Sequence, residues 1–189
     1  MGLPIHNFFW KVKIPYRIIF FLWLVNRNAI LTKDNLIKRN WQGSACCVFC
    51  GNDENINHLF FECSLAKMMW TIMRFAFNIP RNPENVEDLL GPWINRFRGS
   101  LKKNMLVGIS AILWTIWKLR NKAIFENDKV TDPSVPVHLV ANLISDWSVL
   151  QTKPHDQRVL QEGARIYNQI AGEIFEKMRW RMHTGRIQD

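Results

Sequence analysis

All four cysteines of the chain lie between residues 46 and 63, and His58 lies among them. A disulfide framework normally spreads its cysteines to tie distant segments together, whereas a metal site gathers soft ligands in one short segment. The clustering therefore favours a metal site in a reducing compartment. Because such a segment folds around its ion, the metal constrains the local structure more than the hydrophobic pattern does.

Four residues of this segment have the order Cys-x2-Cys-x7-His-x4-Cys: Cys47, Cys50, His58 and Cys63. Two thiolates separated by two residues can reach one ion across a tight turn, where Gly51 allows the chain to reverse. His58 and Cys63 can supply the other two ligands from the start of a helix. Four protein ligands complete the tetrahedral shell of zinc and leave no open position. The sequence thus predicts a structural Zn²⁺.

Two alternatives stay open at this point. Cys46 competes with Cys47, because Cys46-x3-Cys50 is also within the range of known spacings; the two-residue gap is the commoner turn and favours Cys47. The seven-residue gap before His58 also differs from the four-residue gap of retroviral-type zinc knuckles. The other alternative is that the cysteines are unpaired and pack as small apolar residues near an unrelated histidine.

Apolar residues elsewhere recur mostly every three or four positions, which is the spacing of amphipathic helices. No strand run stands out, so we predict a mainly α fold, with at most a small hairpin at the metal site. The expected helices span residues 15–25, 33–40, 64–79, 86–90, 101–126, 137–150 and 156–182. The proline-rich segments 80–84 and 132–136 interrupt them. We therefore expect a small helical zinc-binding module at 1–79 and a helical C-terminal extension at 80–189 that can pack on it.

The formal net charge is +9, from 25 Lys and Arg against 16 Asp and Glu. This balance favours a polyanionic partner, nucleic acid first and an anionic membrane surface second; the alternative is a solvated basic surface. Cations that alternate with aromatic residues suit nucleic acid best. The candidate residues are Lys11, Lys13, Arg17, Lys38, Arg39 and Trp41. Another basic group surrounds Trp180: Lys177, Arg179, Arg181 and Arg186.

Other classes of function lack their sequence signals. The apolar runs at 14–25 and 105–117 are too short to cross a bilayer, and no secretory signal peptide is visible. The chain is expected to be intracellular, nuclear or cytoplasmic, and not secreted. No Gly-rich phosphate loop, nucleophile elbow or HExxH motif occurs. We therefore expect neither an enzyme nor a small-molecule substrate.

An ordered set of motifs over residues 8–75 resembles the reverse-transcriptase zinc-binding domain of plant non-LTR (LINE-type) retrotransposon proteins. The motifs are Trp10-Lys11-Val12-Lys13-Ile14-Pro15, Phe20-Phe21-Leu22-Trp23, Leu31-Thr32-Lys33-Asp34-Asn35-Leu36, Cys47-Val48-Phe49-Cys50 and His58-Leu59-Phe60-Phe61-Glu62-Cys63, followed by Ala66 and Trp70. Residues 114–125 are similar to a segment that often follows in the same polyproteins. In that family the module lies downstream of the reverse transcriptase, and an RNase H-like domain sometimes follows it.

The resemblance implies a non-catalytic zinc-binding module that associates with RNA or DNA in a retroelement context. It does not imply polymerase activity, because Tyr16 and Tyr167 lack the neighbouring aspartate pair of a polymerase palm. RNase H chemistry needs several carboxylates around two Mg²⁺ ions, and the C-terminal half has scattered acids on a helical pattern. The alternative function is a protein-interaction or scaffold fragment, a remnant of a decayed retroelement that does not bind nucleic acid.

Overall fold

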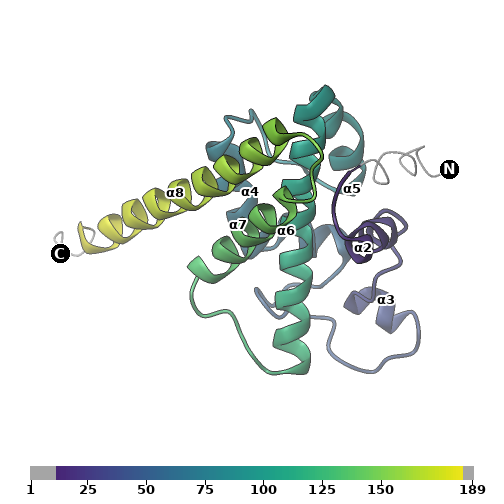
Figure 1. Cartoon of the computed structure of the whole chain (residues 1–189). Helices are drawn as coiled ribbons and strands as arrows, with labels where there is room; N and C mark the ends of the chain where they lie inside the picture. Colours follow the sequence, from purple (N-terminus) through teal and green to yellow (C-terminus); the bar gives the residue numbers. More distant parts are fainter. Residues whose placement is uncertain (1–11, 185–189) are drawn as a thin grey trace.

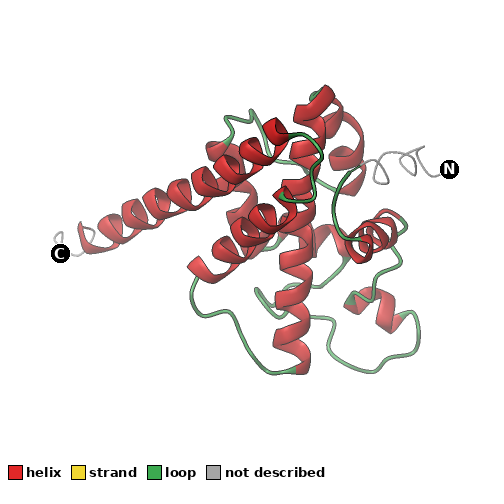
Figure 2. Cartoon of the chain, in the orientation of Figure 1, coloured by secondary structure: helices red, strands yellow, loops and turns green. Residues whose placement is uncertain are grey.

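The computed structural model describes residues 12–184, and the side chains of residues 12–177. The described chain is helical, as predicted (Figure 2). Its one antiparallel bridge, between Cys46 and Asp53, lies where a small hairpin was expected. The α-helices are α2 (Tyr16–Asn26), α3 (Lys33–Ile37), α4 (Ser64–Ala76), α5 (Val86–Asp88), α6 (Gly99–Phe125), α7 (Ser134–Ser148) and α8 (Pro154–Thr184). Two π-helical turns complete the order, η1 (His58–Glu62) before α4 and η2 (Leu89–Trp93) after α5.

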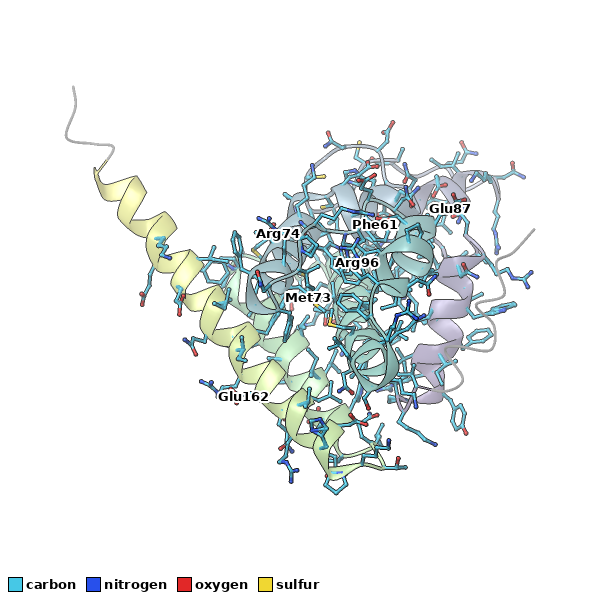
Figure 3. The ribbon with its side chains drawn as sticks, turned by 90° about the horizontal axis from the view of Figure 1, so that it is seen from above. Phe61, Met73, Arg74, Glu87, Arg96 and Glu162 are labelled. Atoms are coloured by element: carbon cyan, nitrogen blue, oxygen red, sulfur yellow. The ribbon has the colours of Figure 1, made fainter. Side chains whose placement is uncertain are left out.

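Helix α6 runs through the middle of the molecule (Figure 1). Most of its residues from Asn104 to Ala123 are buried, because α2, α4, α7, α8 and η1 all contact it. Helix α7 packs along α8, and α8 also crosses α4. Seen from above, Met73 of α4 lies in the interior and Glu162 on the outer side of α8 (Figure 3). Beyond Ala171, no described side chain of α8 is buried, and the helix projects from the rest of the molecule (Figure 1).

Hydrogen bonds join residues on the two sides of the predicted boundary at residue 80. The buried Tyr167 hydroxyl donates to the Met69 carbonyl at 3.2 Å. Gln151 Nε2 donates to the Lys13 carbonyl at 2.8 Å. Buried apolar side chains from both segments form one hydrophobic core. That the boundary at residue 80 separates two domains stays a prediction.

The helix ends differ from the expected ones mainly at prolines. Helix α7 begins at Ser134, inside the segment predicted as a linker, and Pro136 lies in its first turn. Helix α8 begins at Pro154, before the expected start at residue 156. Both differences have the same cause: the first turn of a helix needs no backbone N–H donors, so proline is tolerated there. Helix α3 ends at Ile37, before the expected residue 40, where Asn40 has a φ of 64°.

The tryptophans of the helices differ in burial. Trp70 is fully buried, and its Nε1 donates to the Phe60 carbonyl at 2.7 Å. Trp23, Trp114 and Trp117 are half-buried, so each shows part of its ring to solvent. No helix in the described part of the chain is long and apolar enough to span a membrane.

Candidate metal centre

A tight turn brings Cys47 and Cys50 to the same place. The Gly51 N–H donates to the Cys47 carbonyl at 2.9 Å, and the Cys47 N–H donates to the Asn52 carbonyl at 2.6 Å. Gly51 has a φ of 81°, a left-handed conformation that a residue with a Cβ rarely adopts. The chain reversal at Gly51 is therefore where the sequence predicted it.

The π-helical turn η1 places His58 and Cys63 together. In an α-helix, two residues five positions apart point about 140° away from each other. The wider turn corrects this, because the Cys63 N–H donates at 2.7 Å to the carbonyl of His58, five residues earlier. Cys63 then caps α4 at its N-terminal end. The expected start of a helix is present, but its first turn is π-helical.

The sulfur atoms of Cys47, Cys50 and Cys63 and a ring nitrogen of His58 all lie within 4.8 Å of one another. The Sγ atoms of Cys47 and Cys63 are 3.8 Å apart, and Cys50 Sγ lies 3.1 Å from His58 Nε2. Ligands at zinc bond lengths in a tetrahedron are roughly 3.5–3.8 Å apart. Cys46 is exposed and lies outside this group. Three thiols and one imidazole in this arrangement fit a structural zinc site.

Burial makes charge on these sulfurs costly without a cation. Cys47, His58 and Cys63 are buried, and Cys50 is half-buried. The hydrogen bond between Cys47 and Cys63, together with burial, raises the pKa of the Cys47 thiol. The same hydrogen bond lowers the pKa of Cys63. A bound cation would favour the thiolate form of both, which is the form that coordinates metal.

The surroundings orient the histidine. Its Nε2 faces Cys50, and its Nδ1 lies 3.8 Å from Glu62 Oε2. A ligating histidine commonly faces a carboxylate or carbonyl oxygen with its second ring nitrogen, which fixes the ring orientation. The backbone N–H of His58 donates to Asn55 Oδ1 at 2.9 Å, which fixes the start of the turn. The two ring nitrogens thus face Cys50 and Glu62.

Glu54, between the two pairs of predicted ligands, connects this loop to two helices. Its Oε1 accepts hydrogen bonds from the Lys33 N–H at 3.0 Å and from an Arg120 terminal nitrogen at 2.7 Å. Its backbone carbonyl accepts from the Asp34 N–H at 3.2 Å. Sequence reasoning missed Glu54 and Arg120. The only signal in the sequence is that Arg120, a charged residue next to Leu119, occupies a buried position in an apolar helical pattern.

Those predicted nucleic-acid-binding residues that the structure describes lie on the surface of the molecule. The charged members Lys13, Arg17, Lys38 and Arg39 are exposed. Lys38 also pairs with Asp34 at 3.1 Å. The Trp41 ring is 39% exposed and lies over Gly43, where a Cβ would be 1.9 Å from it.

Two of the predicted basic groups extend beyond the described side chains. Lys11, Arg179, Trp180, Arg181 and Arg186 fall outside them. Lys177 is described and is exposed on the projecting part of α8.

Comparison with protein families supplies the deciding observation: residues 2–70 match the model for zinc binding in reverse transcriptase. Residues 2–70 are a reverse-transcriptase zinc-binding domain. This domain contains the whole Cys47, Cys50, His58 and Cys63 cluster, α2, α3 and the first half of α4. The predicted family and the predicted zinc cofactor are thereby confirmed.

The reverse-transcriptase zinc-binding domain and the helices after it are also similar to a longer plant protein. An Arabidopsis thaliana protein, provisionally named a ribonuclease H protein, is 25% identical over 171 aligned residues. The alignment covers 82% of this chain and 24% of the relative, so the chain spans about a quarter of that protein's length. No solved structure matches the chain.

Proposed function

We propose that the chain is a non-catalytic, zinc-stabilised module that associates with RNA or DNA. Cys47, Cys50, His58 and Cys63 would hold one Zn²⁺. The cation would neutralise the buried thiolates. It would also join the turn that carries Cys47 and Cys50 to the turn that carries His58 and Cys63. Four protein ligands leave no coordination position for water or substrate, which is why the proposed role of zinc is structural.

One observation links the metal centre to the proposed nucleic-acid surface. Through Glu54, the metal-binding loop accepts hydrogen bonds from the first two residues of α3, Lys33 and Asp34. The Lys33 ammonium group also donates to the Cys46 carbonyl. Helix α3 leads directly into Lys38 and Arg39. Folding of the loop around zinc would therefore position these cations.

The comparisons support a nucleic-acid partner. The matched family is a zinc-binding domain of reverse transcriptases, and the Arabidopsis relative is named for ribonuclease H. Both names refer to proteins that act on nucleic acids. Together with the net charge of +9, they favour a polyanionic partner for this chain.

The test is a titration of the zinc-loaded chain with a fluorescently labelled RNA or DNA oligonucleotide over a series of salt concentrations. Each phosphate contact contributes a slope of roughly −0.7 to −0.9 in log K against log salt. A double variant, Lys38→Gln with Arg39→Gln, should weaken binding and reduce this slope. Lys153→Gln with Arg158→Gln removes the same charge near the start of α8 and is the control.

Two results would contradict the proposal. If the chain bound no oligonucleotide at low salt, or if both double variants weakened binding equally, α3 would not be a nucleic-acid surface. A protein partner whose binding was insensitive to salt would instead favour the alternative function, a protein-interaction fragment.

A further inference from the structure

The outward face of α2 carries a line of aromatic rings that end in a guanidinium group. Tyr16 is 80% exposed and Phe20 is 59% exposed. Phe20 stacks on Trp23 with ring centroids 5.7 Å apart and an interplanar angle of 20°. The Arg27 guanidinium carbon lies 5.3 Å from the centroid of the Trp23 ring. Because positions 16, 20, 23 and 27 are four, three and four apart, they follow one side of the helix.

This line of residues is not needed to pack α2. The opposite face supplies the core with five buried side chains: Ile18, Ile19, Phe21, Leu22 and Val25. Trp23 is half-buried, and its Nε1 is shielded without a hydrogen-bond partner among the described residues. What Trp23 shows to solvent is therefore carbon surface, which suits stacking and not hydrogen bonding.

The charged residues of α2 and those next to it in the chain have one sign, whereas α5, which contacts α2, carries the acidic residues Glu87 and Asp88. Helix α2 contains no acidic residue, and Lys13, Arg17 and Arg27 are exposed on or beside it. None of these three side chains has an ion-pair partner within the described residues. A purely apolar partner would leave these cations uncompensated. A ligand that combines flat rings with phosphates would match both features.

We propose that this face of α2 binds unpaired bases of single-stranded nucleic acid. Bases would stack on the Phe20 and Trp23 rings, and the phosphates would face Lys13, Arg17 and Arg27. A duplex keeps its bases stacked inside, so it could use only the cations. This inference rests on the proposed function and adds the strandedness of the nucleic acid and the stacking residues.

The experiment compares a labelled single strand with its duplex, using the full zinc-loaded chain. Alanine substitution of a stacking residue typically costs about 5- to 150-fold in affinity per base. Phe20→Ala should weaken single-strand binding by a factor in this range at every salt concentration, and should change duplex binding little. Because Phe20 is 59% exposed, the thermal unfolding curve of this variant should match that of the unmodified chain.

A matched control exists in α4. Phe75 is 55% exposed, and the Arg74 guanidinium carbon lies 4.5 Å from the centroid of its ring. Phe75→Ala thus removes an exposed ring beside an arginine elsewhere, and it should leave affinity unchanged. Arg17→Gln should reduce the salt slope for the single strand by about 0.7, whereas Phe20→Ala should leave the slope unchanged.

The outcomes separate this inference from the proposed function. Equal affinity for single strand and duplex, with Phe20→Ala without effect but Lys38→Gln with Arg39→Gln weakening binding, would overturn the stacking site and leave the proposed function in place. Absence of binding to either nucleic acid would overturn both. If Phe20→Ala abolished self-association of the chain instead, the face would be a protein interface and the inference would be wrong.

Discussion

Glu54 in the metal-binding loop and Arg120 in α6, 66 residues apart in the chain, form an ion pair that is closed to solvent. The shortest contact is 2.7 Å, and the two side chains are 0% and 1% exposed. Arg120 Nε donates to both carboxylate oxygens, at 3.1 and 3.3 Å. The pair joins the metal-binding loop to the central helix.

Removing one partner of this pair should be strongly destabilising, because the other charge stays buried without compensation. We expect Glu54→Gln and Arg120→Met each to lower the free energy of unfolding by about 3–5 kcal/mol. The double variant should cost less than the sum, since both charges are then gone. Urea denaturation of the zinc-loaded protein measures all three. Additive costs would mean that the pair does not act as a unit.

Loss of a metal ligand should unfold the segment around the site. Cys50→Ser and His58→Ala should each reduce the zinc content from about one ion per chain, measured by mass spectrometry. Amide hydrogen exchange should then accelerate most in residues 40–70, with a smaller effect in α7 and α8. The control is Cys46→Ser, because the exposed Cys46 lies outside the cluster. Full zinc in Cys50→Ser, or lost zinc in Cys46→Ser, would contradict the assignment.

Asp156 should make stability depend on pH in the acid range. Hydrogen bonds from Ser100 at 2.7 Å and from Asn104 at 3.3 Å lower the pKa of this buried carboxyl. Because the folded pKa is below the unfolded value of about 3.9, the stabilisation is complete above that value and disappears as pH falls through the folded pKa. Asp156→Asn should flatten the pH dependence of unfolding in this window. Asp146→Asn, an exposed change in α7, is the control and should preserve the dependence.

Substitutions of Tyr167 measure how tightly α8 packs on α4. Its hydroxyl donates to the Met69 carbonyl, and burial raises its pKa, so it stays neutral and able to donate. Tyr167→Phe removes only this hydrogen bond and should cost about 0.5–1.5 kcal/mol of stability. Tyr167→Ala also leaves a cavity and should cost about 3–5 kcal/mol. Similar values for both variants, by thermal unfolding, would argue against tight packing here.

The helices could be predicted from sequence because their signals are local. Apolar spacing predicted α4, α6 and α8 within a few residues. The cysteine and histidine spacing gave the cluster for the same reason. The starts of α7 at Ser134, with Pro136 in its first turn, and of α8 at Pro154 were misjudged, because proline favours both the end of one helix and the first turn of the next.

Other features depend on contacts between distant residues. Nothing near Glu54 in the sequence shows that its partner is Arg120, since an acid in a polar loop is ordinarily solvated. The exposed pair of stacked rings on α2, Phe20 and Trp23, also depends on contacts between distant residues. Trp23 lies among the apolar residues of α2, but the packing of neighbouring helices covers only part of it. Such residues could not be assigned before the helices were placed.

The π-helical turn between His58 and Cys63 makes the length of this segment matter more than its residue types. Phe60 and Phe61 could be exchanged for other large apolar residues while the His58 carbonyl still accepts from the Cys63 N–H. A single-residue insertion would place the two ligands six positions apart, about 120° around an α-helix, and rotate one ligand away from the others. Among related chains, the site should therefore tolerate substitution here but not an insertion.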